Sequence, residues 1–576
     1  ALWDGLSPGG GQRLAEDFER LSRILVSLRR GFDYGDERIL ARHGRVENGA
    51  FKVGACAYKV VIVPPMLTMR ASTLALLAEF IAQGGTVISV GDRPVRVDGE
   101  EDSRAFDLLA DCPTAELDGA DVEAVLAGVE GLAQGVYSEA RNAEQVVCQR
   151  RRLPGSGELY FLANTDPWKG VEGDFLLPCR GRVHRLCPDT GGSEVMGSRP
   201  VEGGSLVRLD LAPMGSELLL VDPKAESVEP SAPPRLRPLG QFEPPWRIEA
   251  LEANALTLDR CRWRRPGEDW SVDPIEVIHL QGHLAGGESG EVHLLFEFDC
   301  DVDPVEADLE LVLERPQDFR VAVNGQPIPT LTRGPWTDIA FHRISIDRWA
   351  RLGHNTIELT TYFQSGHNLA DDGGHESVSN RQRPLTELES IYLRGAFSVI
   401  SEAPWRPGDR RTLVTRGPFR LVPPIETTDS GEVVTAGWPF YRGRVRLSQT
   451  FRLEESDIQA GLLLSFPNPD GVSLRVKLNG EDLGLRCWAP FDFPVGEAAV
   501  AGDNTLEIEI CGTMRNLLGP HHHKDLEPYG VGPSQFIAGQ GDWLDIDQRE
   551  NRWLEEYAFV RLGIEGNPIL FARTEV

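Results

Sequence analysis

The spacing of apolar residues changes along the chain. Near the amino terminus, an apolar stripe over residues 12–30 predicts an amphipathic helix. Its members recur at three and four residues: Leu14, Phe18, Leu21, Leu25 and Leu28. Apolar runs at 58–63 and 86–90 flank a second helical pattern at 71–83, which two glycines end. A strand, a helix and a strand at this spacing predict a βαβ unit with a parallel sheet.

From about residue 140 the apolar positions recur at a period of two, which is typical of half-buried strands. Residues 140–222 predict a small antiparallel β-domain, with strands at 159–164, 182–186 and 217–221. Residues 223–245 are rich in proline and predict a linker or a wrapping segment. After residue 246 almost every pattern is that of a strand.

An internal repeat in this last part is the most informative feature of the sequence. An alternating strand leads into Asn324-Gly325, and Gly353-His354-Asn355-Thr356 opens a later strand. The same two signals return at Asn479-Gly480 and Gly502-Asp503-Asn504-Thr505. The Asn-Gly pairs lie 155 positions apart (324 to 479), and the Gly-x-Asn-Thr strands lie 149 apart (355 to 504). Asn-Gly tolerates positive φ at both turn positions and closes a tight hairpin. The ordered pair of signals therefore predicts two β-sandwiches of about 150 residues each.

These patterns predict a multidomain, mainly β protein. The expected parts, in chain order, are a helix at 1–30 that could be the remnant of an upstream domain, an α/β domain at 31–139, a small antiparallel β-domain at 140–222, a proline-rich linker at 223–245, a first β-sandwich at 246–400 and a second at 401–576.

Composition narrows the range of partners. The chain has 576 residues and a net charge of −29, from 88 acidic and 59 basic side chains. A surface with this much negative charge repels phosphate backbones and anionic lipids. We therefore expect neither nucleic acid nor a membrane as a partner. Nine scattered cysteines without a CxxC pair favour a reducing compartment, and we expect a cytoplasmic protein without a resident metal. No apolar run reaches 18 residues, as a membrane-spanning helix requires.

The repeat resembles the galactose-binding-like, sugar-binding jelly roll of glycoside hydrolase family 2 and its relatives. The second copy carries more of the pattern, in Gly437-Trp438-Pro439-Phe440-Tyr441 and in Trp488-Ala489-Pro490-Phe491. The run from Arg515-Asn516 to His521-His522-His523 is similar to the end of such modules in α-L-rhamnosidase-like enzymes of family 106. The resemblance implies a protein that acts on plant or microbial polysaccharide.

In those enzymes a catalytic (β/α)8 barrel precedes a glutamine-amidotransferase-like α/β domain, small β-domains and jelly rolls. Residues 32–95 look like that α/β domain. A barrel needs about 250 residues of alternating strands and helices, and the chain shows one βαβ unit before it turns to β. We therefore expect the carboxy-terminal portion of such an enzyme without its barrel. Because Ala1 opens in what reads as a continuing sequence, an upstream catalytic domain in the same polypeptide is an expected partner.

Sugar recognition needs flat aromatic faces for the C–H side of a ring and polar groups at its edge. The second copy offers both kinds of residue, and we expect carbohydrate contacts from Trp438, Tyr441, Trp488, Phe491, Arg515, Asn516, His521 and His522. Trp336 is the weaker candidate in the first copy. Aromatic residues in a sandwich also commonly fill the core, and a structural role for the histidine run stays open.

The other residues that could take part in catalysis or metal binding also have a plain structural interpretation. Cys56 precedes its strand instead of following it, so the α/β domain lacks an amidotransferase nucleophile and reads as a scaffold. The acidic pairs Asp371-Asp372 and Glu387-x-Glu389 could serve a glycosidase, although solvated loops carry many such pairs. Adjacent histidines point to opposite faces of a strand, so residues 521–523 fit one metal ion poorly, even with Asp525 or Glu527 beside them.

We expect no cofactor, and structural calcium at the acidic loop of Asp542, Asp545 and Asp547 remains open. Three functions follow from the sequence. The first is the accessory, carbohydrate-recognition portion of an α-L-rhamnosidase-like glycoside hydrolase. The second is a free-standing carbohydrate-binding or scaffold protein without catalysis. The third is an active enzyme with its site between modules.

Overall fold

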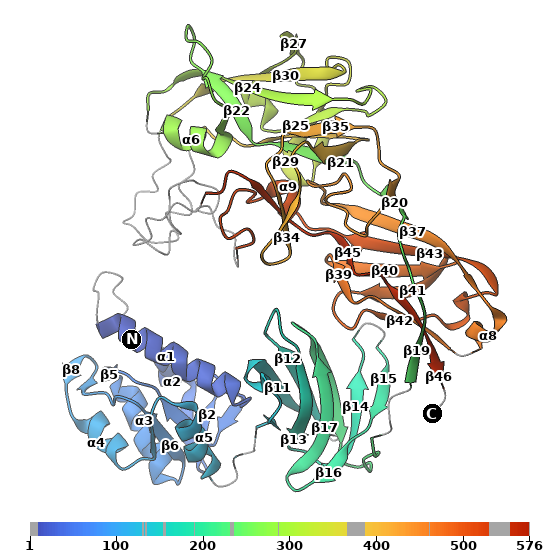
Figure 1. The fold of residues 1–576 in the computed structure, drawn as a ribbon. Coiled ribbons are helices and arrows are strands. Elements are labelled where there is room, and N and C mark those ends of the chain that lie inside the picture. Colours follow the sequence, from blue (N-terminus) through green and yellow to red (C-terminus); the bar gives the residue numbers. More distant parts are fainter. Residues whose placement is uncertain are drawn as a thin grey trace. The chain divides into compact units, whose positions relative to one another are not determined.

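The computed structural model describes residues 10–129, 132, 135–153, 157–188, 191–230, 235–285, 287–365, 386–459, 461–528 and 553–574. Strands predominate (Figure 1), which confirms the predicted mainly β, multidomain fold. Two compact units divide the chain, the first of residues 1–233 and 488–490 and the second of residues 234–487 and 491–576. Among the described residues, the helices fall short of the length and apolarity that crossing a membrane requires.

The first unit begins with an α/β region. Strands β4 (Val60–Val63) and β6 (Thr86–Val90) pair in parallel on either side of α3 (Ala71–Ala82) in the sequence, which confirms the predicted βαβ unit. Strand β9 (Thr114–Ala115) adds a third parallel strand. The remaining elements here are α1 (Gly10–Ser27), α2 (Glu37–His43), β1 (Gly44–Glu47), β2 (Ala50–Val53), β3 (Cys56–Tyr58), β5 (Thr68–Met69), β7 (Arg96–Val97), β8 (Glu100–Glu101), α4 (Arg104–Ala110) and α5 (Gly119–Ala127).

Successive side chains of β6 point to opposite faces of the sheet, as strand geometry requires. Val87 joins a core with residues of α3, whereas Ile88 and Val90 join another with Leu21 and Leu25 of α1. The predicted amino-terminal helix is thus an integral layer of this α/β region. Cys56 is exposed on β3, before the parallel strand and away from any strand-to-helix elbow.

An antiparallel sandwich completes the first unit and matches the small β-domain predicted from the sequence. One sheet has the order β10-β13-β17-β16 and the other β11-β12-β18-β14-β15, with one core between them. The strands are β10 (Tyr137–Ser138), β11 (Val146–Leu153), β12 (Gly157–Asn164), β13 (Val171–Leu177), β14 (Arg182–Leu186), β15 (Ser193–Met196), β16 (Arg199–Val201), β17 (Gly204–Leu211) and β18 (Ser216–Asp222).

The predicted linker at 223–245 has two different structures. Its first part lies along the small sandwich, where Arg182 N–H donates to Ala225 O at 3.0 Å and Ser198 N–H donates to Val228 O at 2.7 Å. Its last part forms strand β19 (Arg235–Gln241), which pairs antiparallel with β46 (Ile569–Thr574). The sequence did not predict this strand, because a proline within an apolar run argues against a central strand. Here Pro238 sits at a register shift, where the ladder is interrupted.

Two sheets form the first sandwich of the second unit. One runs β21-β31-β25-β29-β28, and the other includes β23-β22-β24-β30-β26-β27. Its elements are β21 (Asn254–Leu258), β22 (Arg260–Arg264), β23 (Ile275–Glu276), α6 (Val277–Ala285), β24 (Gly290–Cys300), β25 (Glu310–Glu314), β26 (Arg320–Val323), β27 (Gln326–Ile328), β28 (Thr332–Trp336), β29 (Asp338–Ser345), β30 (Gly353–Phe363), β31 (Ile391–Gly395), β32 (Ser398–Ser401) and β35 (Phe419–Val422).

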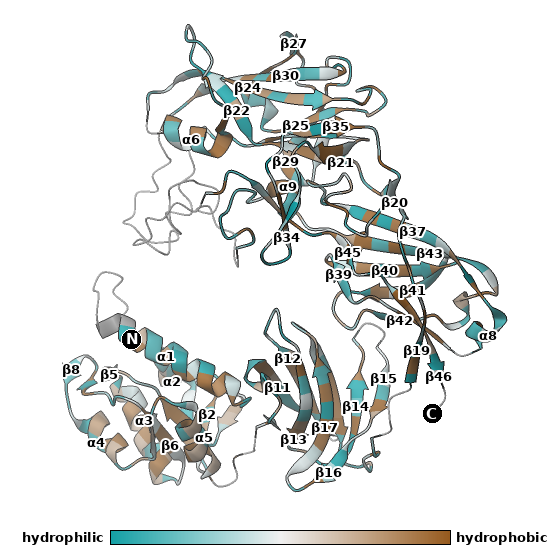
Figure 2. Ribbon diagram, in the orientation of Figure 1, coloured by the Kyte–Doolittle hydropathy of each residue, from teal (hydrophilic) through white to brown (hydrophobic). Residues whose placement is uncertain are grey.

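The second sandwich has a sheet of order β36-β20-β37-β43-β40-β41 and another of order β19-β46-β38-β42. Its remaining strands are β20 (Trp246–Ala250), β36 (Thr427–Thr428), β37 (Arg444–Leu453), β38 (Leu462–Ser465), β40 (Ser473–Leu478), β41 (Glu481–Arg486), β42 (Asp492–Pro494) and β43 (Gly502–Cys511). Figure 2 shows bands of alternating hydropathy along β37 and β43, whose side chains alternate between core and solvent.

The two sandwiches repeat one strand arrangement, as the duplicated turn predicts. In the first copy the order β24-β30-β26-β27 runs across a sheet, and in the second copy β37-β43-β40-β41 does. Both Asn-Gly turns have positive φ at both residues, with 50° at Asn324 and 74° at Gly325, and 53° at Asn479 and 85° at Gly480. Each return strand pairs antiparallel with the strand before its turn.

The chain enters the second sandwich before it builds the first. Strand β20 pairs with β37, and the next strand of that sheet in sequence is β36, at residue 427. The first sandwich is therefore inserted between β20 and β36. Residues 246–250, which the sequence assigned to the first sandwich, belong to a sheet of the second.

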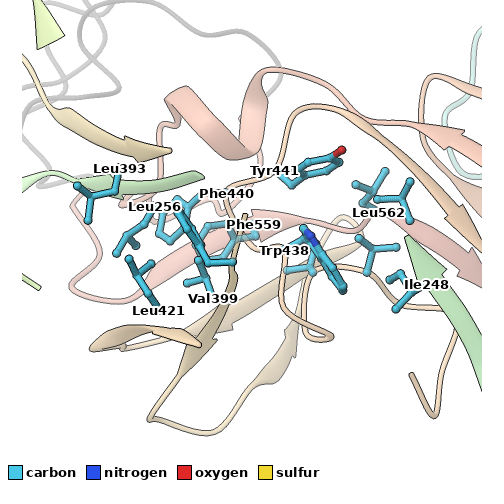
Figure 3. Close-up of a cluster of buried hydrophobic side chains, with 14 of the residues drawn as sticks. Ile248, Leu256, Leu393, Val399, Leu421, Trp438, Phe440, Tyr441, Phe559 and Leu562 are labelled. Carbon is cyan, nitrogen blue, oxygen red and sulfur yellow. The ribbon is translucent and has the colours of Figure 1, made fainter. Parts of the chain in front are cut away.

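One continuous core joins the two sandwiches (Figure 3). Leu256, Leu393 and Val399 of the first sandwich lie in the same buried cluster as Trp438 and Phe440 of the second. We call the region around these five residues the inter-sandwich core. Because the cluster is shared, the two copies pack as one compact unit.

Candidate functional site

Trp438 and Tyr441, two of the predicted sugar platforms, belong to the inter-sandwich core. Each side chain is 2% exposed, so neither ring presents a face to solvent. Burial raises the pKa of Tyr441, whose hydroxyl donates to Arg444 O at 2.8 Å and lies 3.0 Å from a Glu252 carboxylate oxygen. The apolar joint between sandwiches takes up these rings, and this placement corrects the expectation that they line a surface.

Trp488 and Phe491 follow β41 and have different surroundings. Trp488 is 44% exposed, and its ring remains accessible. Phe491 is half-buried and packs against the shared core. Of the predicted aromatic residues, Trp488 therefore keeps the geometry of a platform, and its role in binding sugar stays a prediction.

Arg515 and Asn516 hold helix α9 (Arg515–Leu518) in place. Arg515 Nε donates to Glu527 Oε2 at 2.7 Å, and burial lowers the pKa of Arg515. Asn516 donates to Val560 O at 2.8 Å and accepts from Val560 N–H at 2.9 Å. Both side chains are thus bonded within the protein, although Arg515 Nη1 is buried without a hydrogen-bond partner in the described part of the chain, and their contact with sugar stays a prediction.

His521 and His522 are buried beside the inter-sandwich core. His521 Nε2–H donates to Asn516 O at 2.8 Å, and burial lowers the pKa of His521 to about 4. His522 bonds Leu554 O at 2.9 Å and Asp259 at 3.1 Å. Both imidazoles are therefore bonded within the protein, and their role in binding sugar stays a prediction.

Of the remaining residues that the sequence singled out, some lie within the described part of the chain and others lie outside it. Trp336 is 8% exposed, with the Arg442 guanidinium 5.2 Å from its ring centroid. Asp371, Asp372, Asp542, Asp545 and Asp547 lie outside the described residues. Within the described ranges, no group of three or more His, Cys, Asp or Glu side chains is placed to hold a metal ion.

The structure does bring Glu387 and Glu389 to a concave site, in the first sandwich. We call it the acidic pocket, a cavity of about 280 Å³. Its lining residues are Leu294, Leu313, Glu314, Arg315, Asp318, Phe319, Leu359, Thr361, Tyr362, Gln364, Thr386, Glu387, Leu388 and Glu389.

Four stretches of chain build the pocket, and one of them is β24, which contributes Leu294 to the apolar wall. The other three supply the rest of the lining. The first is the end of β25 with the short 3-10 helix Pro316–Asp318 after it, the second is the end of β30, and the third is the segment 386–389 that leads into β31. Gln281 of α6 fixes this last segment, since its amide donates to Thr386 O at 3.0 Å and accepts from Leu388 N–H at 2.7 Å. Thr361 Oγ1 donates to Asp318 O at 2.8 Å and fixes the first stretch to β30.

The pocket has an apolar wall and an acidic rim. Its buried apolar residues are Leu294, Leu313, Leu359 and Leu388. Tyr362 at the edge is 66% exposed, which leaves a ring face open to solvent. Of the charged rim residues, Arg315 is paired with Asp318 at 2.8 Å. The carboxylates of Glu314, Glu387 and Glu389 thus outweigh the local positive charge.

The crowding of these carboxylates changes the ionisation of one of them. Desolvation by the surroundings, followed by the charges of Glu387 and Glu314, raises the pKa of Glu389 to about 7. Near neutral pH the rim therefore offers both hydrogen-bond acceptors and, while Glu389 holds its proton, an O–H donor. A raised carboxyl pKa in a concave site is a recognised mark of functional sites.

Sequence reasoning found part of this site. It singled out Glu387 and Glu389, but it missed Glu314, Asp318 and Tyr362. A signal for Glu314 was present, because this polar residue ends the buried strand Glu310–Glu314, where the strand meets solvent.

No protein-family model matches the chain, and no curated protein matches its sequence. Among solved structures, a rhamnosidase from Novosphingobium sp. PP1Y aligns over 94% of this chain and 36% of its own length, with 15% identity and a TM-score of 0.43. A Streptomyces avermitilis α-L-rhamnosidase complexed with L-rhamnose aligns over 65% of this chain and 36% of its own, with 13% identity and a TM-score of 0.22.

An apo exo-carrageenase from Bacteroides ovatus aligns over 36% of this chain and 26% of its own, with 12% identity and a TM-score of 0.26. The chain thus spans about a third of the length of the two rhamnosidases. At these TM-scores the likeness assigns neither a family nor an activity to this chain.

Proposed function

We propose that this chain is the carbohydrate-recognition portion of an α-L-rhamnosidase-like glycoside hydrolase, and that the acidic pocket binds one neutral sugar residue. The observation that carries the proposal is the pocket itself, which combines a buried apolar wall, an open tyrosine ring and several carboxylates in about 280 Å³. The duplicated jelly-roll arrangement supports it, since the sequence resemblance links this arrangement to sugar binding.

Each part of the pocket suits one part of a sugar. A pyranose presents C–H groups on its face and hydroxyl groups around its edge. The leucine wall and the Tyr362 ring are suited to the face. Carboxylates accept hydrogen bonds from hydroxyl groups, and such charge-assisted bonds are among the strongest in proteins.

Charge restricts the class of sugar. A uronate or a sulfated sugar would bring a negative charge beside Glu314, Glu387 and Glu389, and their repulsion would weaken its binding. A neutral sugar meets no such repulsion. The proposal therefore favours neutral glycosides over their acidic counterparts.

Isothermal titration calorimetry of the whole chain tests this function. The probes are methyl α-L-rhamnoside, methyl β-D-galactoside and methyl α-D-galacturonate. We expect a neutral glycoside to bind, and Glu387→Gln, Glu389→Gln and Tyr362→Ala each to weaken it about tenfold, as for the loss of one charge-assisted bond or one ring contact. Glu306→Gln, an exposed site outside the pocket, should leave binding unchanged.

The outcomes separate the alternatives. Binding that survives all three pocket variants but fails in Trp488→Ala would move the site to the exposed indole and overturn the pocket assignment. A folded chain that binds none of the glycosides would favour the scaffold alternative. Release of an aryl alcohol from an aryl glycoside by this chain alone would favour the enzyme alternative.

A further inference from the structure

Three hairpins of the chain close on the same dipeptide, and they differ in how the asparagine side chain is held. The sequence has three Asn-Gly pairs, at 48–49, 324–325 and 479–480. The last two belong to the repeat, whereas the first joins β1 to β2 in the α/β region. Asn-Gly is the dipeptide in which asparagine deamidates most readily, because glycine has no Cβ to hinder the approach of its nitrogen to the preceding side chain.

Deamidation of an asparagine needs only the next residue and water. The backbone nitrogen of that residue loses its proton and attacks Cγ of the asparagine. A C–N bond forms, the Cγ–Nδ2 bond breaks, and the lost proton leaves with the nitrogen as ammonia. Water then opens the resulting succinimide ring. Opening at the side-chain carbonyl gives aspartate, and opening at the main-chain carbonyl gives isoaspartate.

The backbone does not distinguish the three sites. In each hairpin the residues that flank the dipeptide pair with one another, so the loop holds two residues. Both residues of every loop have positive φ, with 52° and 69° at 48–49, 50° and 74° at 324–325, and 53° and 85° at 479–480. Backbone conformation therefore gives none of the three an advantage in the attack of the glycine nitrogen on Cγ.

Hydrogen bonds hold both polar atoms of the Asn324 side chain. Its Nδ2 donates to Trp349 O and to Asn355 Oδ1, each at 2.9 Å. Its Oδ1 accepts from Thr356 N–H at 3.1 Å. Cγ can turn toward the glycine nitrogen only after these bonds break, so the bonds slow the attack.

Asn479 is held by the same three kinds of bond. Its Nδ2 donates to Ala498 O at 2.9 Å and to Asn504 Oδ1 at 2.8 Å. Its Oδ1 accepts from Thr505 N–H at 2.8 Å. Asn479 is exposed and Asn324 is half-buried. The two sites therefore share their hydrogen bonds and differ in burial.

The side chain of Asn48 has no such restraint. It is exposed, and it makes no hydrogen bond within the residues that the structure describes. The attacking group has one restraint, since Gly49 N–H donates to Oε1 of the exposed Gln83 at 3.2 Å. Water replaces a single exposed bond of this length at little cost, whereas each of the other two sites has three bonds to lose.

We propose that Asn48 is a site of spontaneous deamidation in the folded chain, and that hydrogen bonds protect Asn324 and Asn479 from the same reaction. The turn at 48–49 supplies both reacting groups, and water is the co-reactant. The conversion therefore needs no enzyme, and its rate is set by the fold around each asparagine.

The products change the β1–β2 hairpin in two ways. Both place a new carboxylate next to Glu47, which adds like charge at the turn. Isoaspartate also adds a methylene to the main chain of a two-residue loop, which disturbs the pairing of Glu47 with Ala50. The same hairpin contributes Val46 and Phe51 to the core that contains α3. The isoaspartyl product therefore loosens the packing of the α/β region.

Peptide mapping by mass spectrometry tests the proposal on the full chain, kept folded at neutral pH for several weeks. Digestion at acidic pH prevents deamidation during preparation, and one digest yields all three Asn-Gly peptides. Exchange of NH2 for OH raises the mass of each converted peptide. We expect Asn48 to deamidate at least about tenfold faster than Asn324 and Asn479, because those two must first break hydrogen bonds.

The same chain unfolded in guanidinium chloride is the matched control. Unfolding removes the hydrogen bonds and keeps the flanking sequences, so the three rates should become similar. The Asn48→Asp variant supplies a chromatographic standard for the aspartyl product. An isoaspartate-specific methyltransferase assay identifies the other product.

Three results would overturn the proposal. One is equal rates at the three sites of the folded chain. Another is an Asn48 that stays unconverted in the folded chain over the time in which it converts in the unfolded chain. The third is a rate difference that persists in guanidinium chloride, which would place its cause in the flanking sequence and not in the hydrogen bonds.

Discussion

The side-chain amide of Asn324 donates a hydrogen bond of 2.9 Å to Oδ1 of Asn355, and the second sandwich repeats this bond between Asn479 and Asn504 at 2.8 Å. In both copies the second asparagine also donates to two backbone carbonyls and accepts from a backbone N–H. The asparagine pair thus joins the hairpin turn to the loop before the return strand, and it explains why the two sequence signals occur together.

Replacement of the inner asparagine should be strongly destabilising. Asn504 is fully buried, and Asn504→Ala leaves Val500 N–H, Val500 O and Gly502 O without their partner. We expect a loss of about 3 kcal/mol in the free energy of unfolding of the second unit, measured by denaturant titration. Asn567→Ala, which removes one exposed bond to Glu243, should cost under about 0.5 kcal/mol. A similar small effect for Asn504→Ala would contradict the role of the pair.

Two tryptophans of the second sandwich should differ sharply on truncation. Trp438→Ala empties part of the inter-sandwich core and should destabilise the second unit by about 3–5 kcal/mol. Trp488→Ala changes a residue that is 44% exposed, so its effect on stability should stay within about 1 kcal/mol. Calorimetric unfolding of both variants checks this contrast. Equal effects would mean that Trp438 is not a core residue.

Acid should weaken the hydrogen bonds that Asp259 forms with His522 and Tyr557. The pKa of Asp259 is lowered from 3.8 to about 2 in the folded chain, so its stabilisation is present above pH 3.8 and is lost as the pH falls through about 2. At pH 5 we expect Asp259→Asn to be less stable than the wild type by about 2 kcal/mol, and the gap to shrink as the pH approaches 2. Denaturant unfolding at several pH values measures the gap. The exposed control Asp429→Asn should have the same stability as the wild type at each of these pH values.

Glu389 should have the opposite dependence on pH. Desolvation and the charges of Glu387 and Glu314 raise its folded pKa from 4.5 to about 7, so ionisation destabilises the fold as the pH rises from 4.5 through 7. Glu389→Gln should therefore be more stable than the wild type at pH 8 and equal to it near pH 4. Thermal unfolding at both pH values gives the comparison, with Glu306→Gln as control. Equal stability at pH 8 would show that the carboxylates do not crowd one another.

The sequence predicts those features of the fold that local rules govern. Asn324-Gly325 and Asn479-Gly480 require positive φ, and the alternation of the flanking strands sets their inward faces, so the duplicated hairpins follow from chain-local physics. The strand at Arg235–Gln241 was missed, because its partner β46 lies more than 300 positions later and no local pattern marks the pairing. The insertion of one sandwich into the other escaped notice for the same reason.

The site was harder to predict than the fold. Trp438 and Trp488 have the same residue type and similar flanking prolines, yet one fills a joint and the other faces solvent. Their difference depends on the packing of two sandwiches, which a sequence pattern does not encode. Glu387 and Glu389 could be singled out as a pair, but Glu314 joins them only after β25 and β31 have paired in the sheet.

A crystal structure of the chain soaked with the neutral glycoside that binds best in calorimetry would test the proposed function most directly. We predict one sugar ring in the acidic pocket, its face toward Tyr362 or the leucine wall, and its hydroxyl groups within hydrogen-bond distance of Glu387 and Glu389. A ring bound at Trp488 or at another surface, with the acidic pocket empty, would contradict the assignment of the pocket as the sugar site.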